Sequence, residues 1–137
     1  MKFTREPVNV ILDSNALFVP LQFKIDIFND LEQLLNRNFE LILLSPVKRE
    51  LEILAETCSL KMRKNAFYAL KLADKCKYIE VNVSALDLTD DIIVKVAEKW
   101  GFAVFTNDRQ LRKRLRDISV PVIYVRQKSR LEIDGMI

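Results

Sequence analysis

The chain has 137 residues, 50% hydrophobic and 30% charged, with a net charge of +3, enough for one well-packed domain and too few for two ordinary ones. Histidine is absent, and the two cysteines, Cys58 and Cys76, form no C-x-x-C pair; histidine triads, imidazole ligands and zinc sites are therefore excluded, and buried free thiols are expected. No segment approaches the roughly 20 apolar residues of a membrane span, and the first seven residues lack a signal-peptide core, so we expect a soluble cytoplasmic protein without a membrane partner.

The predicted elements alternate along the chain. Apolar runs over 8–12, 41–44, 78–83, 102–105 and 120–125 predict strands, and most are continuous, as expected for parallel strands covered on both faces. Helical spacing of apolar residues between them predicts helices over 27–35, 47–54, 62–73, 93–100 and 111–118. The alternation predicts a single α/β domain over 1–137, with a parallel sheet of about five strands and helices on both faces.

Three local features refine this fold. Gly101 is placed to end the fourth helix before the strand that starts at Phe102. Pro121 cannot donate to a strand ladder, so the last strand should be an edge strand or should start near it. An apolar stretch is expected to be ordinary core, with a dimer interface as the alternative; it consists of Leu17, Phe18, Val19, Leu21 and Phe23.

Four of the predicted strands are followed by acidic residues. Asp13 ends the first apolar run, Glu50 follows the second, Asp90 and Asp91 follow the third, and Asp108 follows the fourth. Because open parallel sheets bind ligands at the carboxyl ends of their strands, we expect these side chains to meet. Clustered carboxylates repel one another unless a cation neutralises them, and Mg²⁺ prefers a few carboxylates plus waters. The pattern therefore predicts a divalent-metal site.

Each acid also has an ordinary structural explanation. Asp13 and Asp108 lie at strand-to-helix corners, where an aspartate caps the helix. Asp90 and Asp91 precede a predicted helix, whose dipole favours acids at its start, and Glu50 fits a solvated helix position. Two adjacent acids on a helix cannot face the same way, so one of the pair 90–91 is expected to bind and the other to be solvated. The four positions together favour the metal site.

The same residues form an ordered set of motifs, which are Asp13-Ser14-Asn15-Ala16-Leu17, Glu50-Leu51, Asp90 with Ala97 seven residues later, and the corner Thr106-Asn107-Asp108. In this order and spacing, over nearly the whole chain, the sequence resembles the PIN-domain nucleases. The resemblance favours Asp90 over Asp91 as the third acid.

This resemblance implies a PIN-like fold and a metal-dependent endoribonuclease that hydrolyses RNA phosphodiesters. It implies that the catalytic residues and ligands of Mg²⁺ or Mn²⁺ are Asp13, Glu50, Asp90 and Asp108, with Asp91 as an alternative ligand. The residues implied to hold the carboxylates or the scissile phosphate are Ser14, Asn15 and Thr106. Water activated by the metal would attack the phosphate, which explains how hydrolysis proceeds without histidine.

Basic residues are concentrated after the last acid. The segment from Arg109 to Arg130 contains eight basic residues and one acid, a charge of +7, whereas the rest of the chain has 14 basic and 18 acidic residues, a charge of −4. A basic segment beside an acidic pocket suits a polyanion that must reach a metal, although a solvated helix face has the same composition. We expect the RNA backbone to be bound, without sequence reading, by Arg109, Arg112, Lys113, Arg116, Arg126, Lys128 and Arg130.

Within the family, the last strand followed by Arg126-Gln127-Lys128 resembles the branch that processes small-subunit ribosomal RNA, in a short archaeal-type form. That branch implies a pre-ribosomal particle as the partner. The toxin nucleases of toxin–antitoxin pairs share the acidic set and imply an antitoxin, and homodimers are usual in the family. A non-catalytic RNA-binding assembly module on the same fold is a further alternative. A phosphoacceptor receiver domain or a haloacid-type phosphatase fits poorly, because the first strand offers only Asp13.

Overall fold

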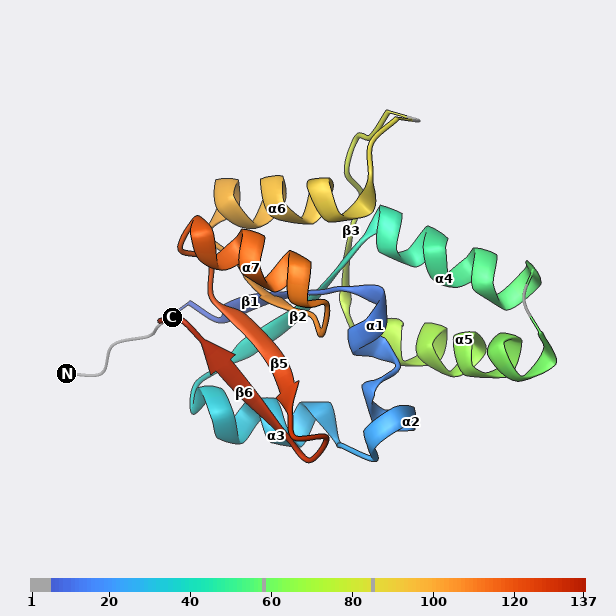
Figure 1. The fold of residues 1–137 in the computed structure, drawn as a ribbon, viewed down its shortest axis with the longest axis horizontal. Helices are drawn as coiled ribbons and strands as arrows, with labels where there is room; N and C mark the ends of the chain where they lie inside the picture. The colour runs from blue at the N-terminus through green and yellow to red at the C-terminus, as the bar shows by residue number, and fades with distance from the viewer. Residues whose placement is uncertain (1–5, 58, 85) are drawn as a thin grey trace.

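The computed structural model describes residues 6–57, 59–84 and 86–137, which form an α/β fold around one six-stranded sheet (Figure 1). The strand order is β3-β2-β1-β4-β5-β6, and neighbouring strands are parallel except for β5 and β6, which are antiparallel. The strands are β1 (Val8–Leu12), β2 (Phe39–Leu44), β3 (Lys77–Ile79), β4 (Ala103–Phe105), β5 (Val122–Arg126) and β6 (Arg130–Asp134). The predicted class and the mostly parallel sheet are confirmed.

Helices connect the parallel strands and cover the sheet. They are α1 (Ser14–Leu17), α2 (Val19–Phe23), α3 (Ile27–Leu35), α4 (Ser45–Thr57), α5 (Leu60–Ala73), α6 (Thr89–Trp100) and α7 (Arg109–Asp117). Figure 1 shows α6 and α7 side by side above the strands, α3 below them, and α4 with α5 as a helical hairpin extending from the side. This arrangement leaves the carboxyl ends of β1 and β4 beside the starts of α1, α6 and α7.

The central strand β1 anchors the core. Val10, Ile11 and Leu12 are completely buried, because helices cover both faces of a strand that also has a parallel neighbour on each side. Burial of each large aliphatic side chain contributes about 1.5–3 kcal/mol. The core therefore holds the ends of β1 and β4 in fixed register.

Gly101 ends α6 in the left-handed conformation, with φ of 69°, as its position predicts.

The strand beside Pro121 starts where the proline predicted, but a sixth strand that the sequence did not predict follows it. β5 starts at Val122, directly after Pro121, but it is not the edge, because β6 pairs with it from Arg126↔Arg130 to Val122↔Asp134. β6 has the sequence Arg-Leu-Glu-Ile-Asp, which alternates polar and apolar residues as a half-buried strand does. Because the segment is short and rich in charged residues, the sequence did not predict a strand there. The short helices α1 and α2 were also not predicted, and β3 is shorter than the predicted run 78–83.

Two smaller expectations can be compared with the structure. In the apolar stretch, Leu17 and Val19 lie in the core, whereas Leu21 is 38% exposed, so most of the stretch is core as expected. Cys76 is a partly buried free thiol whose pKa burial raises to about 11, and Cys58 lies outside the described residues. In the part of the chain that the structure describes, no helix is long and apolar enough to cross a membrane.

Candidate active site

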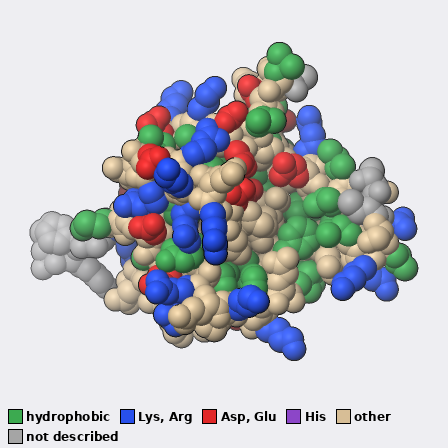
Figure 2. Space-filling view, viewed as in Figure 1, with side chains coloured by type: hydrophobic (Ala, Val, Ile, Leu, Met, Phe, Trp, Pro, Cys, Tyr) green, Lys and Arg blue, Asp and Glu red, His purple; other side chains and the backbone are tan. Residues whose placement is uncertain are grey.

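The acidic residues lie where two adjacent strands end. Asp13 directly follows β1, and Asp108 follows β4 by three residues; the last residues of these strands, Leu12 and Phe105, are paired in register. Glu50 lies early in α4 and Asp90 in the first turn of α6. Figure 2 shows acidic side chains near the middle of this face, with lysine and arginine side chains on the side of α7 and β5. The fold thus brings the four predicted acids to one edge of the sheet.

Asp13 is the most buried of these acids, with 5% of its surface exposed. Its Oδ1 accepts the Ser14 backbone N–H at 2.8 Å, which makes it the N-cap of α1, while its Oδ2 accepts the Thr106 hydroxyl at 2.8 Å and the Asn15 amide at 3.0 Å. Burial raises the pKa of Asp13, the hydrogen bonds partly oppose this, and the nearby Asp108 charge adds to it. Capping and a role in the acidic cluster therefore coexist in one side chain.

Asn15 and Thr106 connect the two strand ends. Asn15 Nδ2 also donates to Thr106 Oγ1 at 3.2 Å, and Asn15 Oδ1 accepts the Asn107 backbone N–H at 2.9 Å. Thr106 Oγ1 in turn accepts the Asp108 N–H at 3.1 Å. These contacts fix the corner after β4 relative to Asp13 and leave little freedom to either carboxylate.

Asn107 is a residue whose role the sequence analysis missed. Its Oδ1 accepts the Val125 backbone N–H at 2.9 Å, which ties the end of β4 to β5. The Thr-Asn-Asp corner contains this residue, but the motif alone does not reveal the β5 contact. An asparagine in a strand-to-helix corner was the available signal.

Asp108 serves as a helix cap. Its Oδ1 accepts the N–H groups of Gln110 at 2.8 Å and Leu111 at 3.1 Å, at the start of α7. Among the described residues no hydrogen bond reaches its Oδ2. The cap fixes the side chain and leaves the second oxygen available near Asp13.

Glu50 faces the same group from α4. Burial raises its pKa, and the charges of Asp13 and Asp90 add to this effect, while hydrogen bonding with the Thr89 and Ser14 side chains opposes it. Ser45, the first residue of α4, accepts the Val81 N–H at 3.0 Å, which ties the start of this helix to the segment after β3. The geometry therefore gives Glu50 acidic neighbours, unlike a solvated helix residue.

Asp90 and Asp91 point to different partners. Burial raises the pKa of Asp90, and the charges of Asp13 and Asp108 raise it further, while Arg114 lowers it. Asp91 Oδ1 instead pairs with Arg114 Nη2 at 2.8 Å. The geometry favours Asp90 as the member of this pair that belongs to the acidic cluster.

The cluster fits a hydrated divalent cation. The pKa values of Asp13, Glu50 and Asp90 are all raised, so their shared negative charge is unfavourable without a counter-ion. Within residues 6–57, 59–84 and 86–137, no three potential ligand side chains are close enough to enclose an ion. Mg²⁺ usually contacts one or two carboxylates and keeps several waters, so it does not require a closed cage of protein ligands.

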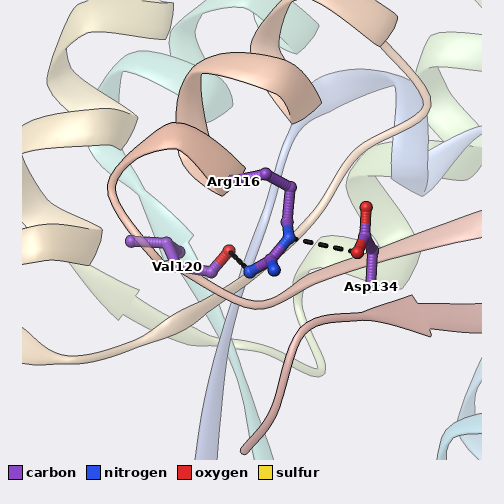
Figure 3. A network of polar contacts seen from close by, with 3 residues as sticks. All are labelled: Arg116, Val120 and Asp134. Atoms are coloured by element: carbon purple, nitrogen blue, oxygen red, sulfur yellow. Dashed lines mark hydrogen bonds and ion pairs between the residues drawn. The ribbon is translucent and has the colours of Figure 1, made fainter.

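The predicted basic residues divide into three groups. One cavity, of about 610 Å³, is lined by four of them, Arg109, Arg112, Arg126 and Lys128. Lys113 and Arg130 are exposed elsewhere on the surface. Arg116 contacts other parts of the fold. Its Nε pairs with Asp134 Oδ1 at 3.1 Å, and its Nη1 donates to the Val120 carbonyl at 3.4 Å (Figure 3). Arg116 lies about 10.5 Å along α7 from the helix start, at 1.5 Å per residue, and its predicted contact with RNA stays a prediction.

Known proteins resemble this chain over most of its length. A model of the PIN-like domain matches residues 10–128. The chain belongs to the PIN-like domain family. This PIN-like chain is 34% identical over 128 residues to "Ribonuclease VapC4" of Methanocaldococcus jannaschii, a match that covers 93% of the chain and 98% of that relative. It is 27% identical over 124 residues to "Ribonuclease VapC9" of Archaeoglobus fulgidus, covering 90% and 87%.

Solved structures share the PIN-like fold. The PIN domain endonuclease Utp24 superposes with a TM-score of 0.79 at 26% identity, covering 96% of this chain and 94% of that one. A chain of VapBC2 from Rickettsia felis, solved with a DNA fragment from its promoter, has a TM-score of 0.64 at 17% identity and covers 87% and 100%. The second likeness concerns the fold alone.

Proposed function

We propose that this protein is a metal-dependent endoribonuclease whose active site is the group Asp13, Glu50, Asp90 and Asp108. The observation that carries the proposal is the convergence of these four acids in a chain without histidine, where burial raises the pKa values of Asp13, Glu50 and Asp90. Proteins named ribonucleases share 34% and 27% of its residues over most of their length, which supports RNA as the substrate.

The acidic side chains would hold Mg²⁺ or Mn²⁺. When bound, such an ion supplies Lewis-acid activation of water and stabilises charge on the scissile phosphate. Asp13 is oriented for this role by Thr106 and Asn15, and Asp108 by its cap on α7. Ser14 lies between Asp13 and Glu50 and is placed to orient either carboxylate. These contacts pre-set the carboxylates, which lowers the reorganisation needed when metal and substrate arrive.

The RNA backbone would lie along the basic surface beside these acids. The residues that we propose for phosphate contacts are Arg109, Arg112, Lys113, Arg126, Lys128 and Arg130. Arg126 also pairs with Glu132 at 3.1 Å, but the Arg126 side chain is 48% exposed, so a phosphate can compete for the guanidinium. Contacts of this kind position the strand and carry no sequence information.

We propose ribosomal RNA processing as the cellular role, with a pre-ribosomal particle as the partner, on the resemblance of the last strand and Arg126-Gln127-Lys128 to that branch; the endonuclease Utp24 shares the fold, with a TM-score of 0.79 at 26% identity. A toxin nuclease, held inactive by an antitoxin, is the second candidate, because the 34% identical relative is named VapC4. We propose a cytoplasmic location for either role, and either role allows a homodimer. A non-catalytic RNA-binding module would keep the basic surface but show no turnover.

The test is cleavage of structured and single-stranded RNAs by the purified protein in Mn²⁺, Mg²⁺ or EDTA, with Glu50→Gln as the inactive variant and Glu32→Gln, exposed on α3, as the control. We expect cleavage that requires metal and Glu50 and that leaves the control unchanged. RNA binding without turnover in every metal would favour the assembly module. Selective cleavage of a ribosomal RNA precursor, rather than of transfer or messenger RNA, would favour the processing role.

A further inference from the structure

The sheet order places the acidic group between two unlike surfaces. Along the carboxyl edge, β4 and then β5 lie on one side of β1, whereas β2 and then β3 lie on the other. One cavity adjoins the acids on the β5 side, since Asn107 and Arg109, the chain neighbours of Asp108, both line it. A second cavity adjoins them on the β2–β3 side, where Glu50 lines it.

The two cavities have opposite charge. The β5-side cavity is lined by Arg109, Arg112, Arg126 and Lys128, and none of the acidic residues that the structure describes lines it. The β3-side cavity is lined by Glu50, Glu52, Glu80 and Asp87 and by one basic residue, Arg49. An RNA strand that crosses the active site therefore meets attraction on one side and repulsion on the other, at distances where such charges matter.

Arg112 is held in the wall of the β5-side cavity. Its guanidinium carbon lies 4.1 Å from the centre of the Tyr124 ring, within the range of a cation–π contact. Arg112 is half-buried and Tyr124 is partly buried, so the pair has fewer conformations to lose on binding than two free surface side chains. A planar cation fixed in this way can bind a phosphate or stack against an unpaired base.

The turn that closes this cavity is strained. Gln127 and Lys128 both have positive φ, 53° and 58°, and both line the cavity. Two successive left-handed residues form the turn between β5 and β6, a position where Asn and Gly are preferred. Long polar side chains there lower stability but place a lysine and an amide at the cavity, and strain of this kind is concentrated at functional sites.

We propose that the β5-side cavity, built around Arg112 and Tyr124, is a subsite for the single-stranded RNA nucleotides on one side of the scissile phosphate. RNA binding is then one-sided: nucleotides over β5 strengthen binding, and those over β2 and β3 add little. This inference rests on the proposed nuclease function. The cavity offers cations, an aromatic ring and the amide groups of Asn107 and Gln127, which suit an unpaired strand better than a rigid duplex.

The test uses oligoribonucleotides that share one mapped cleavage site and are lengthened on only the 5′ or only the 3′ side. We expect kcat/KM in Mn²⁺ to rise about tenfold with the first nucleotides on one side and to change little on the other. Arg112→Ala and Tyr124→Ala should abolish that gain, Tyr124→Phe should keep it, and Arg112→Lys should recover only part of it. Arg63→Ala on α5 is the control, because it removes the same charge far from the site.

Hydrolysis of a small nitrophenyl phosphodiester distinguishes a failure of the subsite from a failure of the nuclease function. This substrate carries no flanking nucleotides, so its hydrolysis by the wild-type protein and by Arg63→Ala reports the activity of the acidic group without the subsite. Failure of the wild-type protein to hydrolyse either substrate with any metal would overturn the nuclease function itself. Equal gains on both sides, or subsite variants that match Arg63→Ala on every RNA, would overturn the one-sided subsite while leaving the nuclease intact. If Tyr124→Ala does not fold, Arg112→Ala and Lys128→Ala carry the same comparison.

Discussion

Asn15 and Thr106, 91 positions apart in the chain, are joined by a hydrogen bond of 3.2 Å, and both donate to the same oxygen of Asp13. A buried carboxylate that accepts two fixed donors has one preferred orientation. The residues that directly follow β1 and β4 are thus locked together before any ligand binds. In this protein the geometry of the acidic group is a consequence of the strand pairing beneath it.

Removal of the Thr106 hydroxyl should shift the pH dependence of cleavage. The hydrogen bond stabilises the ionised form of Asp13, so Thr106→Val raises the pKa of Asp13 further, and protons compete with metal up to a higher pH. We expect the acidic limb of the kcat/KM profile in Mn²⁺ to move to higher pH and the rate at neutral pH to fall by about 10–100-fold. An unshifted profile would show that this hydroxyl does not set the state of Asp13.

The metal-free protein should lose stability as the pH rises. The folded-state pKa values of Asp13, Glu50 and Asp90 lie above their ordinary values of about 4, so the folded protein holds more protons than the unfolded chain between those limits. The stability contribution of these groups is complete below their ordinary pKa and is lost as the pH rises through the raised values.

The measurement that checks this is the Tm of Asp90→Asn minus that of the wild type, in EDTA from pH 4 to pH 7.5. We expect the difference to become more positive as the pH rises, because the variant lacks the charge that repels Asp13 and Asp108. Mn²⁺ at neutral pH should raise the wild-type Tm and raise that of the variant less. A difference that is constant with pH would mean that the acids are not coupled.

Arg116 should support the fold rather than RNA binding. Its contacts with Asp134 and the Val120 carbonyl (Figure 3) are partly exposed, so the ion pair contributes about 0.2–1 kcal/mol and the carbonyl bond about 0.5–1.5 kcal/mol. Arg116→Ala should lower the Tm by several degrees and leave the salt dependence of RNA binding unchanged. A loss of RNA affinity in a variant of unchanged Tm would return Arg116 to the binding surface.

Substitutions in the β5–β6 turn should raise the stability of the protein and weaken its binding of RNA. Replacing Gln127 with Asn and Lys128 with Gly suits the left-handed backbone at both positions and should stabilise the protein by about 0.5–1 kcal/mol. The same double variant should bind RNA more weakly, because it removes one charge and one amide from the cavity wall. Higher stability with unchanged RNA affinity would indicate that the turn has no binding role.

The continuous apolar runs predicted the buried central strands, because parallel strands covered on both faces need apolar residues at every position; Ile11 and Val104 are examples. The meeting of Asp13, Glu50, Asp90 and Asp108 followed from the same topology. The sequence could not assign Arg116, because its partner Asp134 lies on β6, a short charged strand that was not predicted. The contact between Asn107 and Val125 likewise depends on which strand lies beside β4.

Metal-dependent RNA cleavage should depend on the carboxylate of Asp13. The measurement is the single-turnover cleavage rate of a single-stranded RNA in Mn²⁺ for the wild type and Asp13→Asn, together with the Tm of both proteins in EDTA. We expect the variant to lose cleavage by at least about a hundredfold and still to fold. Full cleavage by a folded Asp13→Asn protein would contradict this expectation.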